Sequence, residues 1–192
     1  MDTGLDHPTL VTVITAVFGG LALASACGLR AFLPLLALSL ASRAGLVHLA
    51  AKAGWMGSDA ALWALAAATL LEVLGDKVPI VDHALDVVGT VVRPAAAAVA
   101  GWAMFGAVDP TLSAIAAVIL GGGALGIHLL KAKTRLGSTV LTLGHANPLL
   151  SIGEDVSAAL LSAAAFVAPL LGALLLAGLI VWAIAGRGRR AA

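Results

Sequence analysis

Four carboxylates lie close together in the middle of this chain, on either side of a proline. Glu72 and Asp76 are four residues apart, and so are Asp82 and Asp86, so each pair would lie on one face of a helix. Pro79 stands between the two pairs and is expected to interrupt a helix there. The sequence therefore predicts a broken helix with four carboxylates around the break.

Carboxylates at such a break would carry protons or bind cations. Crowding and burial both raise the pKa of a carboxylate, and oxygen ligands suit Mg²⁺, Ca²⁺ and Mn²⁺. Lys77 and Arg93 lie among the acids, so a neutral ion-pair cluster that fixes helix packing is a second interpretation. A third is an amphipathic helix at the lipid headgroups, with Ile80, Val81 and Leu85 on its apolar face. The residues leave all three open.

A second polar stretch, residues 144–155, has the pattern of a helix start. Asn147 suits the N-cap, and Pro148 suits the first helical position. One interpretation places this helix start in a cavity lined by Ser151 and Glu154, while Asp155 points about 100° away from its neighbour. The other makes it an ordinary N-cap at the membrane surface, where the helix dipole favours acids.

The elements that hold these residues must lie in a membrane. Of 192 residues, 61% are hydrophobic and only 11% are charged, against roughly 25% in a typical soluble domain. Mean hydropathy is +1.07, which also excludes a disordered chain. A net charge of +1 offers no field for nucleic acid, and the single Cys27 excludes a disulfide framework. We expect a single all-α transmembrane domain over residues 1–192, a polytopic membrane helical bundle in the inner membrane.

Uncharged runs of about 20 residues mark candidate membrane spans. Three such runs are residues 8–29, 110–127 and 156–186. The last would measure about 46 Å as one helix, and Pro169 lies inside it, so we expect two helices, 147–167 and 169–186, or one broken helix. Shorter apolar segments predict half-helices or re-entrant pieces: residues 31–42, 60–71 and 94–108. The total is five to seven helical segments.

Parts of the chain resemble each other, which predicts an internal two-fold repeat. The matching pairs are residues 16–31 with 117–132 and residues 81–101 with 156–176. The halves would be residues 8–108 and 110–187, as in transporters whose sites lie between two halves, although Ala/Leu/Gly-rich sequence also produces such matches by chance. The first match superposes Arg30 on Lys131, and both either snorkel to the membrane surface or pair with the acids. Basic residues near the ends of membrane spans favour the cytoplasmic side. By this rule we expect residues 8–29 and 110–127 to cross the membrane in the same direction.

These motifs resemble a bacterial integral-membrane family, domain of unknown function 4126. The resemblance is carried by Gly28-Leu-Arg-Ala-Phe-Leu-Pro34, by Glu72-x-x-x-Asp-Lys-Val-Pro79 with Asp82 and Asp86, by Arg93-Pro94, and by Asn147-Pro148 with Ser151 and Glu154-Asp155. It covers most of the chain and implies a small multi-spanning membrane protein without implying an activity. Residues 72–78 are also similar to the Glu-x-Gly-Asp-Lys/Arg-Thr/Ser motif of cation/proton exchangers, with one extra residue and no hydroxyl.

The leading hypothesis is a small transporter or channel for a cation or proton-coupled solute. Its binding residues would be Glu72, Asp76, Asp82, Asp86, Asn147, Ser151, Glu154 and Asp155, with Arg30, Lys77 and Arg93 as counter-charges. The alternative is a non-transporting lipid-binding or membrane-assembly protein. No nucleophile–base motif is present in the sequence, so we expect no enzyme activity and no cofactor. The expected partners are the bilayer, a cation or protons, and further copies of the chain in a homo-oligomer.

Overall fold

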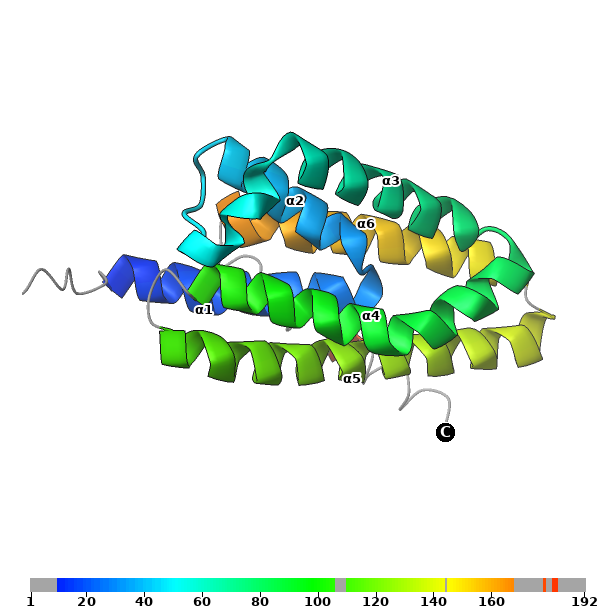
Figure 1. The fold of residues 1–192 in the computed structure, drawn as a ribbon. Coiled ribbons are helices and arrows are strands. Elements are labelled where there is room, and N and C mark those ends of the chain that lie inside the picture. Colours follow the sequence, from blue (N-terminus) through cyan, green and yellow to red (C-terminus); the bar gives the residue numbers. More distant parts are fainter. Residues whose placement is uncertain (1–9, 106–109, 144, 168–177, 179–180, 183–192) are drawn as a thin grey trace, which may run out of the picture.

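A computed structural model describes residues 10–105, 110–143, 145–167, 178 and 181–182. This part of the chain is all-helical and contains no strand, as predicted. Its helices are α1 (Leu10–Leu29), α2 (Phe32–Arg43), η1 (Ala51–Gly57), α3 (Asp59–Gly75), α4 (Pro79–Phe105), α5 (Pro110–Thr142) and α6 (Asn147–Val167). They lie roughly along one common axis in an elongated bundle (Figure 1).

The composition of the helices identifies a multi-pass membrane protein. Within the described residues three segments are long and apolar enough to cross a membrane: Ala84–Phe105, Thr111–Thr142 and Asn147–Phe166. The pair η1 and α3, bent by 66°, makes a fourth if it is counted as one span. Large apolar side chains such as Trp63, Val87, Val118 and Val140 are exposed on the outer faces of α3, α4 and α5, which suits contact with lipid tails.

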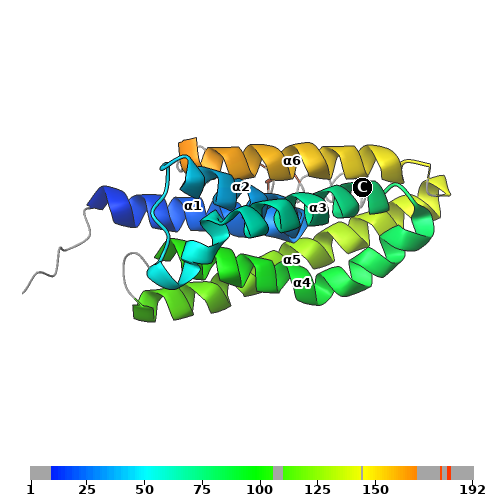
Figure 2. The ribbon, with the colours of Figure 1, turned by 45° about the horizontal axis from the view of Figure 1, so that its top comes forward.

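The first two helices form a hairpin. α1 runs into the bundle, the chain turns at Arg30 and Ala31, and α2 returns toward the side from which α1 came (Figures 1 and 2). With 12 residues, α2 is about 18 Å long and too short to cross a membrane. The predicted half-helix over residues 31–42 is therefore present, and its inner end lies within protein, where such backbone is tolerated.

The predicted break at Pro79 is present, but the predicted short segment over residues 94–108 is wrong. α3 ends at Gly75 and α4 begins at Pro79, where the missing N–H removes no helical hydrogen bond. α4 then continues through Pro94 to Phe105. A proline inside a membrane helix is tolerated when neighbouring helices pack around it, and Figure 1 shows α4 bent near its middle.

The predicted end of a span at Ile127 is also wrong. α5 continues to Thr142, and Lys131 and Arg135 lie inside it with buried side chains. These two basic residues therefore pair with acids inside the bundle, which weakens an orientation inferred from them. The reason is tertiary, because acids on other helices neutralise both charges.

The directions of α1 and α5 match the expectation from the sequence. They lie side by side and run the same way (Figure 1). The internal repeat itself stays a prediction. The helix expected over residues 169–186 falls almost wholly outside the described residues.

A glycine allows α1 and α5 to pack closely. A Cβ at Gly28 would lie 2.7 Å from the Cβ of Ile127 and 2.8 Å from the carbonyl oxygen of Ala124. We expect Gly28→Ala to lower the free energy of unfolding by about 1–3 kcal/mol, measured by thermal unfolding in detergent. Gly123→Ala is the matched control, because a Cβ there meets nothing within 4 Å. Equal stability of the two variants would contradict the close packing.

Candidate functional site

Charged side chains from six parts of the fold meet at the inner end of the α1–α2 hairpin. We call them the ion-pair network: the acids Glu72, Asp76, Asp82, Asp86, Glu154 and Asp155, and the cations Arg30, Lys77, Arg93, Lys131 and Arg135. Every member forms an ion pair with at least one other member. Most of the network is buried, so its stability depends on this mutual pairing.

Arg30 joins three parts of the network from the turn between α1 and α2. Its guanidinium is fully buried and pairs with Asp76, in the link between α3 and α4. Its Nε lies 2.6 Å from Asp155 on α6. It also donates a hydrogen bond of 3.0 Å to the hydroxyl of Ser151, which in turn accepts one of 2.5 Å from Lys77. The hairpin is thus connected to α6 and to the α3–α4 link by one side chain.

Asp76 has three cationic neighbours, as many as Glu154. Besides Arg30, its Oδ2 lies 2.9 Å from Arg135 and 3.8 Å from Lys131. Burial alone would raise the pKa of this carboxyl, but the cations Lys131, Arg30 and Arg135 bring its pKa below the ordinary value. Within the described part of the chain, its Oδ1 is buried without a hydrogen-bond partner. Asp76 therefore holds together three positive charges that would otherwise repel each other.

Arg135 connects α5 to both acidic stretches. It pairs with Asp82 on α4, and its Nε and Nη2 donate to the two oxygens of Glu154 at 3.1 and 2.5 Å. This two-pronged contact uses the planar geometry of the guanidinium. Arg135 thus brings α4 and α6 together across α5.

Glu72 caps the inner end of α2. Its two carboxylate oxygens accept hydrogen bonds from the backbone N–H groups of Ala31 and Phe32, at 2.9 and 3.2 Å. The first N–H groups of a helix have no partner within the helix, and no water satisfies them in an apolar interior. One acid of the network therefore stabilises the break in the hairpin.

Two cations satisfy the carbonyl groups at the inner end of α1 in the same way. Arg93 donates to the carbonyl oxygen of Gly28 at 3.4 Å, and Lys131 donates to that of Leu29 at 3.3 Å. Positive charge is favoured at a helix C-terminus. The network is thus built around a helix break that must be satisfied inside the bundle.

His128 is fixed as a neutral side chain at the edge of the network. Its Nδ1 lies 2.8 Å from Arg93, which can only donate, so Nδ1 must accept. Its Nε2 then carries the hydrogen and lies 3.1 Å from the backbone carbonyl oxygen of Asp86 and 3.3 Å from the Thr90 hydroxyl. We therefore count His128 as uncharged.

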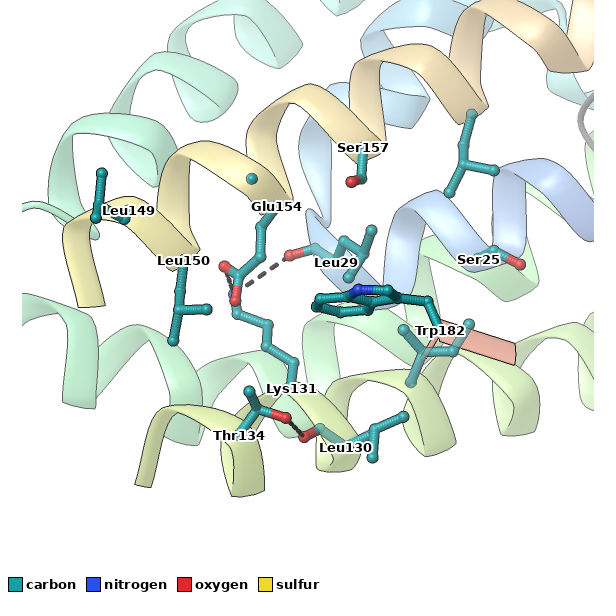
Figure 3. Close-up of a pocket in the computed structure, with 13 residues that line it drawn as sticks. Ser25, Leu29, Leu130, Lys131, Thr134, Leu149, Leu150, Glu154, Ser157 and Trp182 are labelled. Carbon is teal, nitrogen blue, oxygen red and sulfur yellow. Dashed lines mark hydrogen bonds and ion pairs between the residues drawn. The ribbon is translucent and has the colours of Figure 1, made fainter. Parts of the chain in front are cut away.

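A cavity of about 250 Å³ lies beside the network, between α1, α5 and α6 (Figure 3). Its wall is formed by Ser25, Leu29, Ile127, Leu130, Lys131, Thr134, Leu149, Leu150, Gly153, Glu154, Ser157, Leu161 and Trp182. Lys131 and Glu154 are the charged residues among these, and Lys131 Nζ lies 3.0 Å from Glu154 Oε2. The cavity therefore touches the network at one ion pair and is otherwise mostly apolar. Among the described residues no group of three or more His, Cys, Asp or Glu side chains is placed to hold a metal ion.

A family model described as domain of unknown function (DUF4126) matches residues 5–187. The chain belongs to this family. The resemblance inferred from the sequence motifs is thereby confirmed. No curated protein and no solved structure is significantly similar to the chain.

The DUF4126 structure brings together most of the residues that the sequence singled out. All the predicted acids and counter-charges, with Ser151, belong to the network or bond to it. Asn147 does not join them: its Nδ2 donates to the hydroxyl of Thr139 at 2.9 Å, and its Oδ1 has no partner among the described residues, so the predicted cap bond is not seen there. Asp82 and Arg93 are buried, so the interpretation as an exposed interfacial helix is wrong.

Sequence reasoning missed three polar residues on α5 of the DUF4126 chain, of which Lys131 and Arg135 belong to the network and His128 lies at its edge. His128, Lys131 and Arg135 follow each other at intervals of three and four, and a helix places them on one face. Lys131 and Arg30 pair with acids rather than snorkel to the surface. This spacing is the signal that could have placed the three side chains on one buried helix face. The same cations also match the basic end of a membrane span, and the sequence does not distinguish these two interpretations.

Proposed function

We propose that this protein is a small transporter of the inner membrane for a cation or a proton-coupled solute. In this proposal the cavity holds the solute, and the ion-pair network couples its binding to protons or to the movement of charge. The observation that carries the proposal is that Lys131 and Glu154 belong both to the cavity wall and to the network. A solute in the cavity would therefore act directly on the buried charges.

The pairing pattern supports exchange of partners at Glu154. This carboxylate is held by Lys131 and by Arg135, with Arg30 at 3.9 Å. A cation or proton that neutralises Glu154 frees these cations to draw closer to Asp76, which already lies near all three. Such a change of partners alters the contacts between α5 and α6 without exposing an unpaired charge, which is the kind of two-state element that alternating access requires.

Access to the network is graded. Asp86 and Asp155 have side chains 22% and 21% exposed, and Lys77 is 35% exposed, whereas Arg30 and Asp76 are completely buried. Ions would therefore reach the outer acids first, and the inner pair only after partners have changed. Buried ionisable groups in membrane proteins commonly mark such ion pathways.

The proposal is tested by flux across liposomes that contain the purified protein. We expect the parent to move protons or one member of a panel of cations, and we expect Glu154→Gln to lower that flux by about tenfold or more, because glutamine keeps the shape but not the charge. Asp59→Asn is the matched control, since Asp59 lies on α3 with a side chain 80% exposed, away from the network. Equal flux in Glu154→Gln and the parent would contradict the proposal.

A second candidate is a non-transporting lipid-binding or membrane-assembly protein. The apolar wall of the cavity favours it, because Leu29, Leu150 and Leu161 would accept an acyl chain. This candidate predicts saturable binding of a lipid without any flux. The liposome experiment separates the two functions.

A further inference from the structure

We infer that the cavity between α1, α5 and α6 binds an uncharged amphiphile, a single short hydrocarbon chain that ends in a hydroxyl group. The inference names the solute class of the proposed transporter, so its physiological meaning rests on that proposed function. The binding itself depends on the charge balance, the hydrogen-bonding groups and the volume of the cavity.

The charges beside the cavity are balanced, which disfavours a charged ligand. Among the described residues, four cations and four acids pair on this side of the network: Arg30, Lys77, Lys131 and Arg135 with Asp76, Asp82, Glu154 and Asp155. The ion pairs of Arg93 with Glu72 and Asp86 form a separate group, and none of its members lines the cavity. A cation or an anion in the cavity would therefore add an uncompensated charge to an apolar environment. An uncharged ligand keeps the balance.

Glu154 offers one more acceptor site to a ligand. A carboxylate has about four acceptor sites on its two oxygens. Arg135 donates to Oε1 at 3.1 Å and to Oε2 at 2.5 Å, and Lys131 lies 3.0 Å from Oε2. Within the described part of the chain the second site on Oε1 is therefore free. Because Glu154 lines the cavity and is 12% exposed, a ligand that donates a hydrogen bond can reach it.

The other polar groups of the wall favour a hydroxyl over an ether or an ester. Lys131 is only 2% exposed and directed at Glu154, and the hydroxyls of Ser25 and Thr134 already donate to backbone carbonyls of their own helices. Ser157 lies three residues after Glu154, on the same face of α6, and among the described residues its hydroxyl has no partner. A ligand hydroxyl can donate to Glu154 and accept from Ser157, whereas an ether or ester oxygen can only accept.

The size and the apolar wall of the cavity suit one short chain. Its volume of about 250 Å³ equals the share of about eight water molecules in the liquid, which leaves no room for a lipid with two acyl chains. Leu29, Ile127 and Leu161 form much of the wall, and Figure 3 shows the Trp182 indole extending along the cavity toward Glu154. A free alcohol and a glycerol lipid with one acyl chain share the chemistry that fits.

Quenching of Trp182 fluorescence tests the inference directly. The probe is octanol brominated at the end of its chain, titrated into the full chain in detergent at neutral pH, because bromine quenches an indole only at short range. We expect a saturable loss of fluorescence, in addition to a linear loss from probe dissolved in the detergent. The saturable part should disappear in Trp182→Phe, since the wall then holds no indole, and unlabelled octanol should displace the probe.

Matched competitors examine charge and hydrogen bonding separately. Octanoate and octylammonium carry the same chain with a negative or a positive end, and methyl octyl ether is uncharged but cannot donate. We expect each of the three to displace the probe about tenfold or more weakly than octanol. Monooctanoylglycerol distinguishes the two sources of the ligand: stronger displacement than by octanol supports a glycerol lipid, and weaker displacement supports a free alcohol.

Two variants examine the site without touching the ion pairs. A Cβ at Gly153, in the wall, meets nothing within 4 Å, so Gly153→Leu takes up cavity space and should weaken binding by about tenfold or more. Gly122→Leu is the matched control, because Gly122 is exposed on α5, outside the wall, and is equally unobstructed. Ser157→Ala removes the donor and should weaken binding by about threefold or more.

The outcomes separate this inference from the proposed function. Displacement by octanoate, octylammonium or methyl octyl ether as strong as by octanol would overturn the inference, and so would equal affinity of Gly153→Leu and Gly122→Leu. Flux of protons or cations in liposomes without saturable quenching would also overturn it, while transport would stand. Saturable, octanol-selective binding without flux of any ion would support the inference and leave the transport proposal refuted.

Discussion

Replacing Asp76 with asparagine is expected to abolish flux and to destabilise the protein more than any other single change in the network. Arg30 and Arg135 pair with this carboxylate, and Lys131 lies 3.8 Å from it. Removing one partner of a buried ion pair costs about 3–5 kcal/mol, because the remaining charges stay buried without compensation. The free energy of unfolding, from thermal or denaturant unfolding in detergent, and flux in liposomes measure the two effects.

Two further variants distinguish the effect of leaving buried charges unpaired from the effect of any substitution of an aspartate. Asp59→Asn removes an exposed carboxylate paired with Arg43 on the surface and should cost less than about 1 kcal/mol. Combining Asp76→Asn with Arg30→Gln removes one charge of each sign, so it should recover part of the stability but none of the flux. An Asp76→Asn variant as stable and as active as Asp59→Asn would show that the network is not an energetic unit.

Glu72→Ala is expected to have the second largest effect, because it removes the cap of a half-helix inside the bundle. The N–H groups of Ala31 and Phe32 would lose their acceptor, and Arg93 would lose one of its acids. Each buried unsatisfied group costs about 1–3 kcal/mol. We therefore expect a loss of about 3 kcal/mol or more in the free energy of unfolding, with Glu72→Gln losing less because its amide oxygen still accepts.

A surface cap provides the comparison for Glu72. Ser58 caps α3 by accepting from the N–H of Ala61 at 3.2 Å, at an exposed position. Ser58→Ala should cost only about 1 kcal/mol, because water can replace the hydroxyl. If Glu72→Ala were no more harmful than Ser58→Ala, the inner end of α2 would have to be reached by water. Hydrogen exchange at Ala31 and Phe32 measures that access directly.

Local features of the sequence were enough to predict much of the fold. High hydropathy indicated a membrane bundle, Pro79 located the break between α3 and α4, and α6 was predicted with the boundaries that the structure has. The short apolar run over residues 31–42 indicated a half-helix. These features follow from solvation and from the backbone limits of proline, which act over a few residues.

Packing between distant segments decided the rest. The sequence indicated that the acids were not ordinary surface groups, but not which cation each one meets, since Arg30 and Asp76 lie 46 positions apart along the chain, and Arg135 and Asp82 lie 53 apart. From the sequence alone, Pro94 is expected to end a helix. In the structure α4 continues through Pro94, with neighbouring helices packed around it. From the sequence alone, Lys131 and Arg135 are typical of the end of a membrane span. In the structure both side chains are buried, because they form ion pairs with acids from α4, α6 and the α3–α4 link. Hydropathy is a property of neighbouring residues, whereas the neutralisation of a buried charge depends on partners that only the tertiary structure brings within reach.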